Sequence, residues 1–222
     1  MKEKKFKDPL EVMGCAKGYS REELVKNLKR HARFTSKLIR QINEIPDVVL
    51  RNLGTPPARK INRMMREVFT EAYRAKQFTR TEINNRGVLY GVVFLKHQVI
   101  DFVLKYFHER WSECVICLYN EYNKITSTIN ERGEIQEIKL PLMVVVDQIS
   151  KDRPIIPYFE DIQFSGNEIF ETLYKSQFIK ERENNSYYKK MIPKQCFELP
   201  GLRKGIERKH WQKYRSLDSF YK

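Results

Sequence analysis

Arginine side chains recur at helical spacing between Thr55 and Arg80. At about 3.6 residues per turn, one side of this stretch collects Arg59, Arg63, Arg66, Arg74 and Gln77. A guanidinium group is a rigid fork of N–H donors that matches the oxygens of a phosphate. Glu67 and Glu71 lie to one side of these arginines, so the stripe is almost purely positive. The pattern indicates a helix face that binds anions, and the alternative is a face that is only solvated.

The opposite side of the same stretch is apolar, and its members are Ile61, Met64, Met65, Val68, Ala72 and Ala75. The hydroxyl of Thr55 can cap the first turn, where Pro56 and Pro57 are tolerated because N–H groups there have no helical partner. We therefore expect one amphipathic helix from Thr55 to Arg80, with one face in the core and one face in solvent.

The overall composition is that of a folded and strongly basic protein. Of 222 residues, 42 are Lys or Arg and 28 are Asp or Glu, which gives a formal net charge of +14. Hydrophobic residues make up 41% of the chain, enough for one sizeable core. A basic excess favours a polyanionic partner, because basic side chains displace condensed counterions from a phosphate backbone. Charge alone does not distinguish DNA, RNA and an anionic membrane surface.

The chain has no apolar run of about 20 residues and no apolar segment after its basic start. We expect a soluble, intracellular protein of the cytoplasm that makes no membrane contact. Among four cysteines, only Cys114 and Cys117 form a C-x-x-C pair, within a run that resembles a strand. A structural zinc site usually needs two such pairs, so these are predicted to be reduced core thiols, with no metal and no cofactor.

A second basic helix is predicted from Ser20 to Ile45. Ser20 and Glu23 have the spacing of a capping box, and Pro46 ends the apolar periodicity. Its polar face carries Lys26, Lys29, Arg30, Arg33, Lys37 and Arg40. If the two helices form a hairpin, their basic faces can join into one electropositive surface. His31, within this helix, is interpreted as a hydrogen-bonded histidine at the surface or partly buried, and not as a ligand.

After Arg80 the pattern predicts strands and a helix of the α+β class. Alternating or β-branched runs predict strands at Val88–Leu95, Cys114–Tyr122, Lys124–Ile129 and 134–140, and His97–Arg110 predicts a helix. We expect a four-stranded, mainly antiparallel sheet covered by helices on one side. The other side is expected to be polar, with Thr126, Thr128, Gln136 and Lys139 on it.

The remaining segments contain loops and one further helix. Three prolines predict that residues 140–163 form a loop-rich, solvated region. Ser165 and Glu168 have capping-box spacing and predict a helix that ends before Pro193. We divide the chain into a basic helical N-terminal extension (1–54), an α+β core domain (55–200) and a basic and aromatic tail (201–222). The tail suits either stacking on single strands or packing as a last helix.

Three separated motifs resemble a poorly characterised family of DNA metabolism or repair proteins. The first motif is Glu71-Ala72-Tyr73-Arg74 with Phe78 and Arg80, which is similar to the family pattern E-A-H-R…F-x-R-F. The second motif is His97 with Tyr106-Phe107 and Arg110, which is similar to the family pattern P-x-H…H-F-x-x-R. The third motif is Ile179-Lys180-Glu181-Arg182-Glu183-Asn184, which precedes Pro193. The resemblance covers roughly residues 60–200. Members of that family often occur beside a radical-SAM protein or fused to a uracil-DNA-glycosylase-like domain, which implies a role in DNA repair.

The leading hypothesis is a nucleic-acid-binding accessory protein of DNA repair or processing, which holds the phosphate backbone through arginine-rich helix faces. The expected binding residues are Arg59, Arg63, Arg66, Arg74, Arg80, Arg110, Arg182, Lys29 and Arg33. The expected partners are DNA or RNA and a repair enzyme.

Two alternatives stay open. One is an enzyme acting on nucleic acid, such as a glycosylase or nuclease, that uses His97 with Glu71 or Glu181 for acid–base catalysis. Tyr73 and Tyr106 stand where the family has histidine, so His97 is the imidazole that remains in these motifs. The other alternative is a subunit whose basic faces bind an acidic protein.

Overall fold

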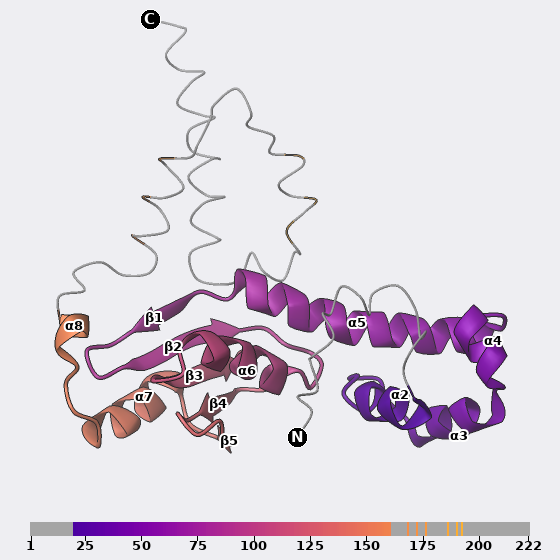
Figure 1. Cartoon of the computed structure of the whole chain (residues 1–222), viewed down its shortest axis with the longest axis horizontal. Coiled ribbons are helices and arrows are strands. Elements are labelled where there is room, and N and C mark those ends of the chain that lie inside the picture. The colour runs from indigo at the N-terminus through magenta and orange to yellow at the C-terminus, as the bar shows by residue number, and fades with distance from the viewer. Residues whose placement is uncertain are drawn as a thin grey trace, which may run out of the picture. The chain divides into compact units, whose positions relative to one another are not determined.

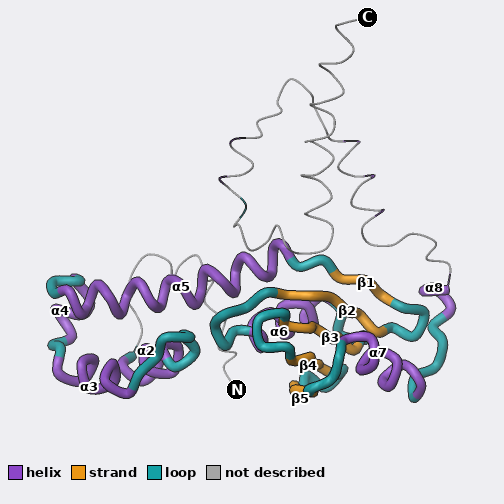
Figure 2. The backbone as a smooth tube through the Cα atoms, turned by 180° about the vertical axis from the view of Figure 1, so that it is seen from behind, coloured by secondary structure: helices purple, strands orange, loops and turns teal. Residues whose placement is uncertain are grey.

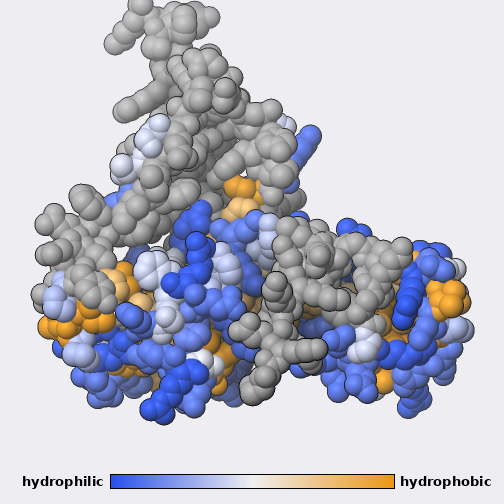
Figure 3. Space-filling model, in the orientation of Figure 1, coloured by the Kyte–Doolittle hydropathy of each residue, from blue (hydrophilic) through white to orange (hydrophobic). Residues whose placement is uncertain are grey.

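The computed structural model describes residues 20–160 and the single residues Glu168, Thr172, Ser176, Ser186, Lys190 and Ile192. The chain divides into two compact units (Figures 1 and 2). Of the described residues, unit 1 contains those from Ser20 to Gln77 together with Leu95–Tyr106, and unit 2 contains Phe78–Phe94 together with those from Phe107 onward. Hydrophilic residues dominate the visible surface of the described residues in Figure 3, as the composition predicts.

Unit 1 is helical. Its elements are α2 (Arg21–Leu28), α3 (Ser36–Glu44), α4 (Asp47–Asn52), nearly all of α5 (Pro56–Phe78) and most of α6 (Ile100–Arg110). Apolar side chains from four of these helices form one buried cluster, which consists of Leu24, Leu28, Leu38, Ile42, Leu50, Ala58, Ile61, Met64 and Met65. The predicted capping box is present, because the Ser20 hydroxyl accepts the N–H of Glu23 and the Glu23 carboxylate accepts the N–H of Ser20.

The predicted helix from Thr55 to Arg80 is confirmed as α5. The Thr55 hydroxyl accepts the N–H of Ala58 at 3.4 Å, and Pro56 is the first helical residue. All six residues of the predicted apolar face are buried, namely Ile61, Met64, Met65, Val68, Ala72 and Ala75. The helix ends at Phe78, two residues before the predicted end.

The prediction of one helix from Ser20 to Ile45 is wrong, because the chain breaks between α2 and α3. Residues 29–35 form turns, and α3 begins only at Ser36. The physical reason is that two backbone N–H groups in this segment bind imidazole nitrogens and not helical carbonyls. One of those imidazoles belongs to His97, which lies far along the sequence, so the local pattern of apolar residues cannot report it.

Unit 2 contains a mixed sheet of five strands in the order β1-β2-β3-β4-β5. The strands are β1 (Thr81–Ile83), β2 (Val88–Val93), β3 (Val115–Asn120), β4 (Ile125–Ile129) and β5 (Ile135–Ile138). β2 and β3 are parallel, and the other neighbouring pairs are antiparallel. The α+β class is confirmed, but the sheet has five strands and one parallel pair. Parallel neighbours need a long crossover, and residues 94–114 with α6 provide it.

Two further expectations about unit 2 are wrong. Residues 140–163 are not mainly loop, because α7 (Leu142–Lys151) and the short α8 (Pro157–Glu160) form there. Thr126 and Thr128 are buried, since strand register places them on the sheet face that holds Cys117. Val145 and Val146 of α7 cluster with Cys117 on this face. The Thr126 hydroxyl satisfies its burial by donating to the carbonyl of Leu140 at 2.7 Å.

Cys114 and Cys117 are both buried free thiols, as predicted. Burial raises the pKa of Cys117 to about 12, which keeps the thiol protonated and unreactive at neutral pH. Among the described residues, no helix combines the length and the apolar character that spanning a bilayer requires. The predicted helix after Ser165, apart from five helical single residues, and the tail from residue 201 lie outside the described residues.

Candidate nucleic-acid interface

The arginines of α5 form an exposed stripe in unit 1. Arg59, Arg63, Arg66 and Arg74 are all exposed, and helical spacing places them within an arc of about 80°. Arg59 donates to the carbonyl of Leu53 at 3.2 Å. Within the described part of the chain, Arg66 and Arg74 have no ion-pair partner. Most of the guanidinium donors of this stripe therefore face solvent.

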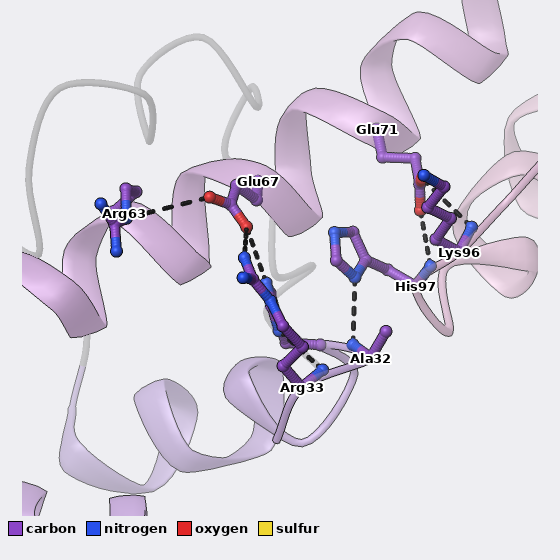
Figure 4. A network of polar contacts seen from close by, with 8 residues as sticks. Ala32, Arg33, Arg63, Glu67, Glu71, Lys96 and His97 are labelled. Atoms are coloured by element: carbon purple, nitrogen blue, oxygen red, sulfur yellow. Dashed lines mark hydrogen bonds and ion pairs between the residues drawn. The ribbon is translucent and has the colours of Figure 1, made fainter. Parts of the chain in front are cut away.

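Glu67 links a fifth arginine to the stripe (Figure 4). Its Oε2 atom lies 3.1 Å from Nη2 of Arg33, which comes from the turn between α2 and α3, and its Oε1 atom lies 3.9 Å from Nε of Arg63. The same Oε2 atom lies 2.9 Å from Nε2 of His31. The hydrogen bond from His31, followed by the contact with Arg33, lowers the pKa of Glu67 below its ordinary value. Arg33 and the exposed arginines of α5 are called the basic face below.

Two histidines hold the turn that carries Arg33. The N–H of Ala32 donates to Nδ1 of His97 at 3.1 Å, and the N–H of Arg33 donates to Nδ1 of His31 at 3.0 Å. The ring centroids of the two histidines are 4.3 Å apart. In a continuous helix both N–H groups would bind the carbonyl four residues earlier. The imidazoles therefore stabilise the break between α2 and α3.

Arg30 ties the same turn to α6. Its two Nη atoms donate to the carboxylate of Asp101 at 2.6 and 2.9 Å, and its carbonyl accepts the N–H of Gln98 at 2.8 Å. The guanidinium also lies 4.2 Å from the ring centroid of Phe102. A bidentate, partly buried pair of this kind has a fixed geometry. Arg30, which the sequence placed on a solvated basic face, is thus a structural residue.

Glu71 positions His97 through the backbone. Its two carboxylate oxygens accept the N–H groups of Lys96 at 3.1 Å and of His97 at 2.7 Å (Figure 4). Glu71 is buried, and desolvation raises its pKa above the ordinary value. Of the two carboxylates that the enzyme alternative offered to His97, Glu71 lies close to it, but the carboxylate binds the main chain and not the imidazole.

The hydrogen bonds fix the tautomers of both histidines. Each Nδ1 accepts an N–H, so in the neutral ring the proton is on Nε2. His31 uses that proton to bind Glu67. For His97, burial first and the neighbouring His31 second lower the pKa to about 4. His97 is therefore neutral at physiological pH, and its Nδ1 lone pair is already engaged.

A family profile described as a domain of unknown function, DUF4130, matches residues 29–199. The chain belongs to the DUF4130 family. No curated protein and no solved structure matches the chain. The DUF4130 match begins at Lys29, directly after α2, and includes the turn, α5, both histidines and the sheet. Its description assigns no activity, so the link to DNA repair that the sequence motifs imply stays an expectation.

Among the described residues of the DUF4130 region, one group has the composition of a metal site. Nitrogen or oxygen atoms of His31, Glu67 and His97 lie within 4.8 Å of one another. Two imidazoles and a carboxylate are ligands that zinc or iron can use. A ligating histidine, however, donates its second ring N–H to an acceptor. Here both Nδ1 atoms face backbone N–H donors, which holds the proton on the nitrogen that a metal would need.

The other predicted residues of this DUF4130 chain lie elsewhere. Lys29 is exposed at the start of the turn in unit 1. Arg80 is half-buried and Arg110 is exposed, both in unit 2, and both take part in further interactions. Arg182 and Glu181 lie outside the described residues. Sequence reasoning missed the role of Glu67, although its spacing of four residues from Arg63 was a signal for an ion pair.

Proposed function

We propose that this chain is a nucleic-acid-binding protein, most readily of DNA, that holds the phosphate backbone on the basic face of unit 1. The observation that carries the proposal is the exposed arginine stripe of α5, which Arg33 extends across Glu67. A charged helix face is often only solvated. Two features support binding here: four arginines fall on one narrow arc, and the chain has a net charge of +14.

An accessory role in DNA repair or processing rests on the resemblance of the sequence motifs. The geometry gives less support to the enzyme alternative, because Glu71 binds backbone N–H groups and the Nδ1 of His97 binds Ala32. General acid–base catalysis needs a group that can reach the substrate proton. An acidic protein as partner would instead be recognised if a protein remained bound to the chain after nuclease treatment.

The test is the salt dependence of binding to short oligonucleotides, measured by fluorescence anisotropy. For duplex DNA, the slope of log K against log salt should be about −0.9 for each phosphate neutralised. Replacing Arg63, Arg66 and Arg74 together by Ala should weaken binding by at least about tenfold at low salt and reduce the slope by up to about 3, similarly for all sequences.

The matched control replaces Lys26, Lys37 and Arg40 by Ala. These residues are exposed on α2 and α3, and their replacement removes the same three charges from unit 1. If net charge alone produced the affinity, the two triple variants would lose it equally. Equal losses would move the binding surface away from α5, and wild-type binding that is absent or indifferent to salt would refute the proposed function.

A further inference from the structure

Glu67 is an acidic residue in the middle of the basic face. A carboxylate on an anion-binding surface ordinarily lowers affinity, because it repels the ligand. The contacts of Glu67 point to a different effect. It brings together Arg33, from the turn between α2 and α3, and Arg63, from α5 (Figure 4).

Among the described residues, Glu67 is the ion-pair partner of both arginines, and most of their donors have no other partner. The side chain of Arg33 is 75% exposed and that of Arg63 is 71% exposed. Each guanidinium has five N–H donors. Glu67 accepts one hydrogen bond from Arg33 at 3.1 Å, and its contact with Nε of Arg63 is an ion pair at 3.9 Å, longer than a hydrogen bond. A hydrogen bond thus orients the Arg33 fork and an ion pair draws Arg63 toward the same carboxylate, so that both forks lie at the surface with N–H groups that can make bidentate phosphate contacts.

The buried side chain of His31 donates a hydrogen bond to Glu67 and holds it in place. The side chain of His31 has no solvent exposure, and its Nε2 atom lies 2.9 Å from Glu67 Oε2. The N–H of Arg33 occupies Nδ1 of the same ring and so keeps the proton on Nε2. The carboxylate thus has a fixed position, and the arginines that it holds lose less conformational freedom when a ligand binds.

We infer that Glu67 is a positioning residue that presents Arg33 and Arg63 as a two-armed clamp for one phosphate group of a nucleic-acid backbone. The inference rests on the proposed function and gives it a specific site. The expected change in affinity is opposite to that for ordinary charge repulsion. Removing the negative charge of Glu67 from the basic face weakens binding, because losing the fixed positions of Arg33 and Arg63 outweighs the gain in net positive charge.

The test compares Glu67→Gln with Glu44→Gln in the full chain. Glu44 is exposed on α3 and has no ion-pair partner among the described residues, so its replacement changes the net charge by the same amount. The ligand is an oligonucleotide with hydroxyl ends, in which every phosphate is a backbone phosphodiester. We expect Glu67→Gln to weaken binding by about threefold to tenfold and Glu44→Gln to tighten it slightly.

A second background tests whether Glu67 acts through the arginines. With Arg33 and Arg63 both replaced by Ala, Glu67→Gln should no longer weaken binding and should behave like Glu44→Gln. Replacing both arginines by Lys keeps the charge and removes the forks, so it should weaken binding while the melting temperature is retained. This Lys variant also decides the matter if Glu67→Gln fails to fold.

The outcomes separate the two claims. Wild-type binding that depends on salt, together with equal tightening by Glu67→Gln and Glu44→Gln, overturns the clamp and leaves the proposed function standing. Unchanged binding of the double Lys variant overturns the clamp as well. Absence of wild-type binding overturns the proposed function itself.

Discussion

His31 and His97 accept backbone hydrogen bonds at the turn between α2 and α3, in place of the carbonyl groups that would accept them in a helix. Their Nδ1 atoms accept the N–H groups of Arg33 and Ala32, which the broken helix leaves without carbonyl partners. An imidazole can accept in this way only while it is neutral. The position of Arg33, and with it the clamp at Glu67, therefore depends on the Nδ1 acceptors of both rings.

The role of His97 can be tested with a pair of substitutions. Asn has an oxygen near the position of Nδ1, so His97→Asn can keep the acceptor for Ala32, whereas His97→Ala removes it. We expect His97→Ala to lower the free energy of unfolding by about 2 kcal/mol and His97→Asn to recover about half of the loss. Urea denaturation at neutral pH measures both. Equal losses would mean that the ring only fills space.

The His97→Asn variant also isolates the contribution of His97 to the pH dependence of the free energy of unfolding. The pKa of His97 is about 4 in the folded chain and 6.5 ordinarily, so as pH falls from 6.5 to 4 the unfolded state binds the proton first. The free energy of unfolding should therefore decrease over this range, by about 2 kcal/mol after allowance for the partly exposed ring. Subtracting the His97→Asn curve removes the contributions of Glu67, whose lowered pKa acts in the same direction, and of Glu71, whose raised pKa acts in the opposite direction. A difference that does not change with pH would contradict the assignment.

At the residue level, the sequence indicated which side chains are special more reliably than what they do. The enzyme alternative paired His97 with Glu71 or Glu181, and Glu71 does lie beside His97, but through main-chain hydrogen bonds. His31 was expected to be hydrogen-bonded and at most partly buried; its bond to Glu67 confirms the first expectation, and its full burial shows that the second was wrong. The position of Glu67 depends on a turn that forms only when distant residues meet, so spacing alone could not reveal it.

At the level of elements, local signals predicted helices with a cap and a periodic apolar face. α5 and the start of α2 have both signals and were predicted within two residues. β1 was missed because it has only three residues. α7 was missed because Pro141 and Pro154 suggested a loop, although they flank the helix and do not interrupt it. The break between α2 and α3 uses a local acceptor from His31 and a distant one from His97, which lies 65 residues after Ala32 and gives no local signal.

Substitution of Gly91 tests whether β1 lies as close to β2 as the structure shows. An ideal Cβ atom at Gly91 would lie 2.6 Å from the carbonyl oxygen of Arg80, a backbone atom that cannot move without displacing β1. We expect Gly91→Ala to destabilise the chain by more than about 2 kcal/mol. Gly54→Ala is the control, because its Cβ would meet only Val49 Cγ1 at 3.7 Å. Similar melting temperatures for the two variants would contradict the register of β1.

At the level of the whole molecule, unit 1 is discontinuous in sequence. Residues 95–106 leave the sheet region between β2 and β3 and complete unit 1. They supply the partners of Ala32, Arg30 and Glu71. They also contribute four buried apolar side chains, Leu95, Val99, Val103 and Leu104.

Truncation tests this dependence. A fragment that ends after residue 94 lacks these partners, and we expect it to melt without a cooperative transition. A fragment that ends after Tyr106 contains all of unit 1, and we expect it to show a cooperative transition by circular dichroism. A cooperative transition in the shorter fragment would show that residues 95–106 are dispensable.

The discontinuity also affects the order of events during synthesis. His97 leaves the ribosome 65 residues after Ala32, which corresponds to a delay of about 3 to 13 s at ordinary rates of translation. Until then, nothing holds the N–H of Ala32 away from a helical carbonyl. The nascent chain can therefore form the continuous helix that its local sequence favours, and this helix has to be broken after residues 95–98 emerge. The turn that carries Arg33 would then form late, after the transient continuous helix.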